Sequence, residues 1–453
     1  MIFMNMDLPS QFKERMKQVL KAHYDEYIAN LEKPPYKAIR INTLKTDEKY
    51  LKEKLNFLGK KTGFCPDGYY LTENAGAIGN HPLHHAGAFY VQEPSAMSVV
   101  TALKPRPGER VLDLCAAPGG KTTQIAAAMK NEGIIVANEF ITSRAGTLVS
   151  NVERLGAQNV AVTSSHPDLL CNELRGFFDK VLVDAPCSGE GMIRKDKKIL
   201  LEWSIENIKA CAQRQLKILQ SASLAVTEGG MLCYSTCTLA PEENEGVVAR
   251  FLKENPEFSL VKIEEEFGTA ALDEFSDGAE NMNFARRIFP SLGGEGHFVA
   301  LMKKSGQIKR TSEQACISKS ENIKVFNDFY VEYFKSSISE QVSFIGDKAY
   351  FLPGVVGVKK SYMLRCGLFL GSVVKNRFEP SHALFAARGL DSRRVLNLEL
   401  GDTRIKKFLH GEEILCDGDK GYTAVCIDSI PLGFGKVSNG VLKNHYPKGL
   451  RIF

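Results

Sequence analysis

Short apolar runs alternate with helix-length amphipathic segments between residues 110 and 304, and this alternation limits the possible folds more than any other feature of the chain. Such a pattern is typical of a parallel β-sheet whose strands are joined by crossover helices. One helical stretch is expected to end at Gly229 and Gly230, and the next to begin at Pro241. The strand candidates are residues 111–115, 134–140, 159–163, 180–185, 231–237 and 297–304. The sequence therefore predicts an α/β domain with a mostly parallel sheet.

The regions that flank this block have other patterns, and a chain of 453 residues is too long for one core. Residues 1–95 mix helix and strand signals, which predicts an α+β N-terminal domain. The α/β domain is expected at 96–305. A polar stretch at 308–322 follows it, so we expect a linker and an intermediate domain at 306–375. Residues 376–453 contain short strand candidates and glycine turns, which predicts a β-rich C-terminal domain.

The cysteines and apolar runs exclude several classes of protein. Eleven scattered cysteines do not form a disulfide framework, and the CxxxC pair of Cys233 and Cys237 has no partner pair at zinc-finger spacing, so no metal is expected. No apolar run is long enough to span a membrane, and the first residues lack a signal-peptide pattern, so we expect a cytoplasmic protein. Seven cysteines are interpreted as core or inert surface residues: Cys65, Cys171, Cys211, Cys316, Cys366, Cys416 and Cys426.

Positive charge is concentrated in the last third of the chain. From Lys303 to the end there are 24 basic and 15 acidic residues, although the net charge of the whole chain is only +5. A basic flank beside an acidic centre favours a polyanionic partner. A solvated basic face without a partner is the alternative.

The segment DLCAAPGGKT, Asp113 to Thr122, links the first strand to a helix through small residues. Glycines there let a ligand approach the backbone and the positive end of the helix dipole. A phosphate loop would need glycine at Cys115, and the dinucleotide motif GxGxxG is absent. Glu139, at the end of the second strand, is placed to accept hydrogen bonds from ribose hydroxyls, unless it is merely solvated. The best candidate ligand is S-adenosylmethionine.

Two cysteines follow neighbouring strand candidates, Cys187 after Asp184 and Cys237 at the end of the fifth strand. Ligands of open α/β sheets bind beyond the carboxyl ends of strands, so both thiols should face the cofactor loop. A thiolate that adds to carbon 6 of a pyrimidine activates carbon 5 for methylation, and a second thiol could act as acid or base. Lys121 could favour the thiolate, and Asp184 could hold the exocyclic amine of cytosine and share a proton with ring nitrogen 3. Spacing alone does not rank the two cysteines.

Three motifs in this order, DLCAAPGGKT, DAPCSGEGM and YSTCTLAPEENE, together resemble the Nop/Sun family of RNA cytosine-C5 methyltransferases. The likeness extends through RINTLK (40–45) and YVQEPSAM (90–97) to the tail LGFGKVSNGVLKNHYPKGLR, which is similar to a PUA domain. GMIRKD after the fourth strand and the PUA-like end are most similar to the bacterial F type, which acts on small-subunit ribosomal RNA. The resemblance implies a class I, Rossmann-like methyltransferase fold with a mostly parallel seven-stranded sheet.

The resemblance also implies roles for individual residues. Cys237 is the implied nucleophile and Cys187 assists product release, with Asp184 and Lys121 contacting the base. Many relatives have an aspartate where this chain has His166, with Asp168 as a less favoured substitute. The implied cofactor contacts are Cys115, Ala116, Ala117, Pro118, Gly119, Gly120, Lys121, Glu139, Arg144, His166 and Asp184.

The tail carries Lys436, Lys443, Lys448 and Arg451 among turn residues and aromatics, which fits phosphate contacts to folded RNA. The expected partner is small-subunit ribosomal RNA or the 30S particle, with no DNA and no membrane, and the protein is expected to be a monomer. Two alternatives are a methyltransferase that acts on transfer RNA and a non-catalytic RNA-binding ribosome assembly factor. The intact cysteines favour catalysis.

Overall fold

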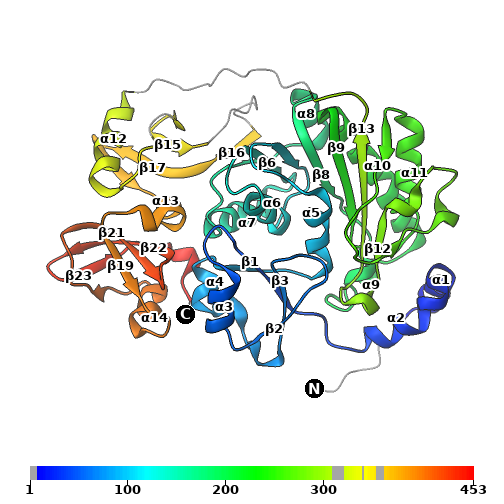
Figure 1. The fold of residues 1–453 in the computed structure, drawn as a ribbon, viewed down its shortest axis with the longest axis horizontal. Coiled ribbons are helices and arrows are strands. Elements are labelled where there is room, and N and C mark those ends of the chain that lie inside the picture. Colours follow the sequence, from blue (N-terminus) through cyan, green and yellow to red (C-terminus); the bar gives the residue numbers. More distant parts are fainter. Residues whose placement is uncertain (1–7, 309–320, 339–340, 353–361, 453) are drawn as a thin grey trace.

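A computed structural model describes residues 8–308, 321–338, 341–352 and 362–452 (Figure 1). Most of the linker expected at 308–322 lies outside these ranges, as does Cys316. The described strands form four sheets. In the described ranges, no helix combines the length and the apolar character needed to cross a bilayer.

The central sheet has ten strands. Along its main path the order is β11 (Thr269–Ala270), β12 (Arg286–Ile288), β13 (His297–Lys304), β9 (Val226–Thr236), β8 (Phe178–Asp184), β5 (Arg110–Asp113), β6 (Ile134–Asn138), β7 (Val160–Thr163) and β16 (Met363–Cys366). The tenth strand, β10 (Phe258–Leu260), pairs with β13.

Strands β5 to β9 are parallel, and β13 pairs antiparallel with β9. The path from β7 to β12 contains seven strands, the number that the family resemblance implied, and the six strands expected from the sequence are among them. The α/β prediction is therefore confirmed. The count of seven was nevertheless too low for the sheet as a whole. The short strands β10 and β11 extend the edge beyond β9, and β16 comes from the region after the α/β domain and pairs antiparallel with β7.

Helices cover both faces of this sheet. Successive residues of a strand point to opposite faces, so strands that are apolar throughout need helices on both sides to bury them. Val111 packs in one apolar cluster with Leu148 of α7, whereas the next residue, Leu112, packs in the other with Leu219 of α10. The helices of this domain are α5 (Ser98–Leu103), α6 (Gly120–Ala128), α7 (Thr142–Arg154), α8 (Pro167–Glu173), α9 (Ile199–Glu202), α10 (Ile205–Ala225) and α11 (Glu245–Glu254).

Two helix boundaries differ from the expectation. Helix α10 ends at Ala225 and β9 begins at once, so Gly229 and Gly230 lie inside a strand rather than in a helix cap. Gly229 has a φ of 73°, and a side chain there would meet the carbonyl of Gly306, so close backbone packing explains this glycine. Helix α11 begins at Glu245 rather than at Pro241, because the Asn244 side chain bonds to Thr236 and to the carbonyl of Thr238 and holds a turn.

In the described residues before the central domain, an antiparallel sheet is accompanied by four α-helices. The sheet order is β2 (Leu58–Lys61), β3 (Gly68–Leu71), β1 (Ala38–Ile41) and β4 (Phe89–Val91). The helices are α1 (Ser10–Leu20), α2 (Tyr24–Leu31), α3 (Glu48–Lys54) and α4 (Pro82–His85).

The C-terminal part has two further sheets. The first has the order β14 (Val342–Ile345), β15 (Lys348–Phe351), β17 (Leu368–Val374) and β18 (Arg377–Pro380). The second has the order β19 (Val395–Leu398), β21 (Gly421–Ile427), β22 (Ile430–Ser438), β23 (Val441–Asn444) and β20 (Ile414–Leu415). The helices are α12 (Asn322–Tyr333), α13 (His382–Arg388) and α14 (Thr403–His410). A boundary at 376 would divide β17 from its antiparallel partner β18. Helix α13 also packs against the last sheet, where the ring of Phe385 stacks on that of Phe434.

The N-terminal sheet and the C-terminal sheet of β19–β23 share one apolar core, and Figure 1 shows them side by side. Phe89 of β4 and Leu432 of β22 belong to the same buried cluster. Lys45 donates hydrogen bonds at 2.8 to 3.3 Å to three carbonyls. They belong to Ala86 of the N-terminal domain, Arg154 of the central domain and Pro431 of the C-terminal sheet. The two ends of the chain therefore pack as one layer against the central domain.

Candidate active site

The two cysteines singled out from the sequence lie together. Cys187 follows β8 and Cys237 follows β9, and their Sγ atoms are 3.2 Å apart. Parallel pairing of Asp184 with Ser235 places the two strand ends at the same height. The contact with Cys237 and burial raise the pKa of Cys187 well above its ordinary value, so Cys187 stays a thiol at neutral pH. A protonated thiol can donate a proton or relay one, but it is a poor nucleophile.

Backbone and side-chain contacts hold the two cysteine loops in register. The amide of Gly191 donates to the carbonyl of Cys237 at 3.0 Å. The hydroxyls of Ser188 and Thr238 lie 2.8 Å apart, and the amide of Ser188 donates to Glu243 at 3.0 Å. The separation of the two thiols is therefore set by a buried network rather than by mobile side chains.

Asp184 and Lys121 form the second element of the site, as expected. Lys121 Nζ donates to Asp184 Oδ2 at 2.6 Å, and Ser235 Oγ donates to Oδ1 at 2.7 Å. Burial alone would raise the pKa of Asp184, but the Lys121 ammonium and His297 outweigh it and hold the pKa below its ordinary value. The same ion pair raises the pKa of Lys121 against the effect of burial. Asp184 is thus a carboxylate that can accept hydrogen bonds from a substrate amine.

The predicted cofactor loop connects β5 to α6 at the same edge. Arg144 donates to the carbonyl of Ala117 at 3.1 Å and lies 3.6 Å from the Glu139 carboxylate, so it links the loop to the end of β6. Glu139 is 5% exposed and accepts a hydrogen bond from the amide of Ile141 at 3.0 Å. Through Arg144, the loop and the glutamate predicted to contact the cofactor are linked at the same ends of β5 and β6.

The loop has the features of a built ligand cradle. Gly119 caps α6 with a φ of 107°, and a side chain there would press on Leu148 at 3.1 Å. Beneath the loop, Thr122 donates to Asp113 Oδ2 at 2.7 Å, whereas the buried Oδ1 has no hydrogen-bond partner within the described ranges. Burial raises the pKa of Asp113 to about 7. These residues fit an adenosine-containing ligand that brings its own polar groups.

His166 caps a helix at this edge. It precedes α8, and its Nδ1 accepts a hydrogen bond from the amide of Asp168 at 3.3 Å. Its ring contacts the ring of Phe140 edge-on, with centroids 5.5 Å apart, and Phe140 is 61% exposed. The imidazole thus takes the capping role that an aspartate could fill, and Nε2 remains for a ligand. Asp168 contributes its backbone to the cap.

Three site residues were not singled out from the sequence. Ser235 holds Asp184, His297 starts β13 beside it, and Arg40 is buried in β1. Arg40 donates to the carbonyl of Gly120 at 2.7 Å and to Thr123 at 2.9 Å, so it fixes the cofactor helix to the N-terminal sheet. A charged residue inside the apolar run AIRI was the available signal for Arg40.

The buried carboxyl of Glu243 should make the free energy of unfolding depend on pH. Burial raises its pKa to about 7, although Ser188 and Gln215 hydrogen bonds oppose the shift. The folded protein therefore keeps a proton that the unfolded chain releases between about pH 4.5 and pH 7, and stability falls as the pH rises through that window. Glu243→Gln should flatten this dependence by up to about 3 kcal/mol, measured by urea unfolding at about pH 5 and about pH 8. Equal pH slopes for the two proteins would contradict the assignment.

The four tail residues separate into two groups. Lys436 and Lys443 are paired across β22 and β23, and Lys436 lies over the Tyr422 ring at 5.1 Å. Both lysines and Lys448 are exposed. The Arg451 guanidinium instead donates to the carbonyl of Tyr446 at 3.3 and 3.4 Å. The paired lysines are the stronger candidates for phosphate contacts, and Arg451 also ties the chain end to its own domain.

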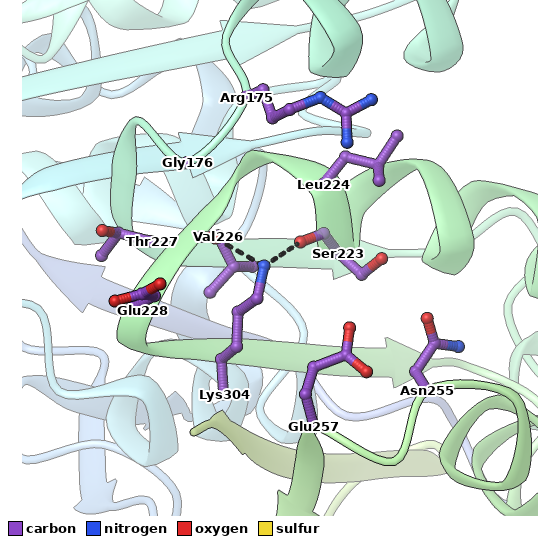
Figure 2. A pocket seen from close by; sticks show the side chains of 10 residues that line it. All are labelled: Arg175, Gly176, Ser223, Leu224, Val226, Thr227, Glu228, Asn255, Glu257 and Lys304. Atoms are coloured by element: carbon purple, nitrogen blue, oxygen red, sulfur yellow. Dashed lines mark hydrogen bonds between the residues drawn. The ribbon is translucent and has the colours of Figure 1, made fainter. Parts of the chain in front are cut away.

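A separate cavity of about 500 Å³ opens at the opposite edge of the central sheet (Figure 2). It lies where β9 begins and β13 ends, and Lys304 fills part of it by donating to the carbonyls of Ser223 and Val226 at 3.3 and 3.1 Å. Neither cysteine, nor Asp184 or Lys121, lines it. The two cysteines, Asp184 and Lys121 therefore lie away from this cavity, at the opposite ends of the strands.

Family models match the chain in four consecutive segments. Residues 100–303 match the model described as 16S rRNA methyltransferase RsmB/F, and residues 8–94 match the N-terminal domain of 16S rRNA methyltransferase RsmF. Residues 328–387 match the first C-terminal domain of the RsmF rRNA methyltransferase, and residues 395–452 match the methyltransferase RsmF PUA domain.

Relatives match over nearly the full length. Ribosomal RNA small subunit methyltransferase F of Shewanella baltica (strain OS223) is 33% identical over 98% of this chain and 96% of its own length, and the same enzyme of Shewanella oneidensis is 32% identical over 98% and 97%. A solved methyltransferase homologue from Pyrococcus horikoshii is 33% identical, with a TM-score of 0.59, and covers 66% of this chain and 96% of that one. The chain therefore belongs to the 16S rRNA methyltransferase F family of S-adenosylmethionine-dependent methyltransferases.

Proposed function

We propose that this protein methylates carbon 5 of cytosine in 16S ribosomal RNA through a covalent bond between Cys237 and carbon 6 of the base. The observation that carries the proposal is the pair of thiols 3.2 Å apart, beside an ionised Asp184 and the cofactor loop. The names of the relatives support ribosomal RNA as the substrate. Bound S-adenosylmethionine supplies an electrophilic methyl group at this site.

Each residue of the site has its own part in the proposed chemistry. Cys237 attacks carbon 6 as a thiolate, which makes carbon 5 nucleophilic. Lys121 stabilises negative charge nearby, and Asp184 accepts from the exocyclic amine, so uracil, which has a carbonyl at that position, is disfavoured. Cys187, held as a thiol, takes the carbon 5 proton while it passes its own proton to the departing Cys237 sulfur. Both sulfurs must reach one base, so the cytosine leaves its stack to enter the site.

The cofactor contacts are proposed for the loop Cys115–Lys121, with Glu139 on the ribose hydroxyls and the edge of His166 near the adenine. Arg144 positions both the loop and Glu139 through its contacts with each. We also propose that the enzyme works in the cytoplasm as a monomer on ribosomal RNA or the 30S particle.

Purified protein, labelled S-adenosylmethionine, and ribosomal or transfer RNA test the proposal. We expect 5-methylcytosine in small-subunit ribosomal RNA and its loss in Cys237→Ala. Methylation confined to transfer RNA would redirect the proposal to the other substrate, and binding without methylation would leave only an assembly factor.

The tail lysines predict a salt-dependent effect on RNA binding. Lys436 and Lys443 place like charges on facing strands, an arrangement that a bound phosphate stabilises. Each substitution to alanine should reduce the slope of log affinity against log salt by about 0.9 if one phosphate contact is lost. Lys406→Ala, an exposed lysine on α14, is the matched control and should leave the slope unchanged. Unchanged slopes in all three variants would remove the lysine pair from the RNA interface.

A further inference from the structure

His297 is a buried histidine at the active edge of the sheet. It is the first residue of β13, it is 3% exposed, and its neighbour Phe298 pairs with Thr236 of β9. Because β13 runs antiparallel to β9, its start lies beside the end of β9, next to the cysteines. The turn before it is fixed by close packing, since a side chain on Gly296 would lie 2.9 Å from the Cα of Gly191 in the cysteine loop.

The His297 imidazole makes no hydrogen bond to another described residue. Across the described ranges, neither ring nitrogen of His297 has a hydrogen-bond partner, although both are buried. Its Nε2 lies 3.9 Å from Asp184 Oδ1, an ion-pair distance that is longer than a hydrogen bond. Such contacts in active sites often tighten only when substrate binds.

Two carboxylates face this imidazole. Asp184 is one, and Glu93, which follows β4, is the other. Burial alone would raise the pKa of Glu93, but His297 and Lys195 lower it, and the carboxylate accepts bonds from Ser95 and from the amide of Glu295. Lys121 is held on the far oxygen of Asp184. Two carboxylates therefore lie near the imidazole, and Asp184 is the one that belongs to the cysteine site.

The proposed reaction needs a proton at this point. When Cys237 adds to carbon 6, electrons shift to ring nitrogen 3, which must then gain a proton. In the proposed chemistry Asp184 shares a proton with that nitrogen, but an ionised carboxylate has no proton to give. Ser235 donates to Asp184 and does not ionise near neutral pH, and Lys121 holds its proton more tightly because of its ion pair. Histidine is the side chain that exchanges protons in this pH range.

We propose that His297 is a positioning residue that holds the proton which Asp184 passes to ring nitrogen 3 of cytosine. As the Cys237 sulfur bonds to carbon 6, one proton moves from imidazolium Nε2 to Asp184 and one from Asp184 to nitrogen 3. Carbon 5 then gives its proton to Cys187, which passes its own proton to the Cys237 sulfur as the carbon–sulfur bond breaks toward that sulfur. The proton on nitrogen 3 returns to the imidazole by the route through Asp184. The inference rests on the proposed cytosine chemistry.

The test is the pH dependence of kcat for methyl transfer to 16S ribosomal RNA in wild type, His297→Gln, His297→Phe and Ser235→Ala. Wild type should lose rate at alkaline pH as the relayed proton is lost. Both His297 variants should lower kcat by about 10- to 100-fold with little change in KM, and the alkaline decline should disappear. Ser235→Ala removes another Asp184 contact and should keep the decline.

An alkaline decline that persists in the His297 variants, at any kcat, would overturn the proton role and leave a packing role. His297→Phe keeps an aromatic ring in the same space, so it provides the measurement if His297→Gln does not fold. Wild-type protein that forms no 5-methylcytosine would overturn the proposed function, and this inference with it.

Discussion

Cys187→Ala is expected to convert the enzyme into a trap that accumulates a covalent protein–RNA complex. Removing this thiol takes away the group that accepts the carbon 5 proton and reprotonates the Cys237 sulfur, while Cys237 can still attack. Turnover should fall by about 10²- to 10⁴-fold, and a band of protein shifted by RNA should appear on a denaturing gel with S-adenosylmethionine and ribosomal RNA. Because the two sulfurs are 3.2 Å apart, Cys187 can act on the same base to which Cys237 is bonded.

Two controls make the experiment decisive. Cys187→Ala/Cys237→Ala should show no shifted band, and Cys237→Ala alone should lose at least about a thousandfold in methyl transfer. Cys366→Ala removes a partly exposed thiol on β16 and should behave as wild type. Normal turnover in Cys187→Ala without a shifted band would mean that product release does not depend on this thiol.

Arg287→Met is expected to cause the largest loss of stability. Arg287 is 1% exposed and makes paired contacts of 2.6 and 2.5 Å with Glu245, and it also donates to the carbonyl of Leu239 at 2.8 Å. Breaking one side leaves a buried unpaired carboxylate, which costs about 3–5 kcal/mol. Urea unfolding measures the change, and activity should fall with it because Leu239 belongs to the loop after Cys237.

A surface pair provides the matched comparison for this prediction. Arg250 and Glu254 lie one helical turn apart on α11, 2.9 Å from each other and largely exposed. Arg250→Met should cost about 1 kcal/mol or less. Arg287→Met/Glu245→Leu should recover part of the loss, since no charge remains buried. A loss below about 1 kcal/mol in Arg287→Met would refute the importance of the buried pair.

The strand ends could be predicted because parallel strands bring their carboxyl ends to one edge. That rule placed Asp184, Cys187 and Cys237 together from their positions after apolar runs, and the structure confirms that they meet. The glycine-rich loop and Glu139 follow the same rule. Strands with alternating residues and long amphipathic helices can be recognised from a few neighbouring residues, so the positions of the strand ends could be predicted from local sequence.

The site residues and the strand that the sequence did not predict depend on contacts between segments far apart in the chain. His297 reaches the site through an antiparallel strand more than 50 residues beyond Cys237, and Arg40 reaches it from another sheet. Gly229 and Gly230 were misassigned because paired glycines suit a helix cap and a distorted strand equally well locally. Strand β16 could not be foreseen because its partner β7 lies about 200 residues earlier.

The core shared by the first and last sheets limits how this chain can be cut or recombined. Phe89 and Leu432 lie in one cluster, and His85 Nδ1 lies 3.1 Å from the Tyr446 hydroxyl. A truncated chain that stops before β19 would leave the apolar side of the first sheet facing water, beside the helix that Arg40 anchors. The C-terminal sheet is therefore a poor candidate for exchange as an independent module, and chimeras should be joined so that both sheets come from the same parent.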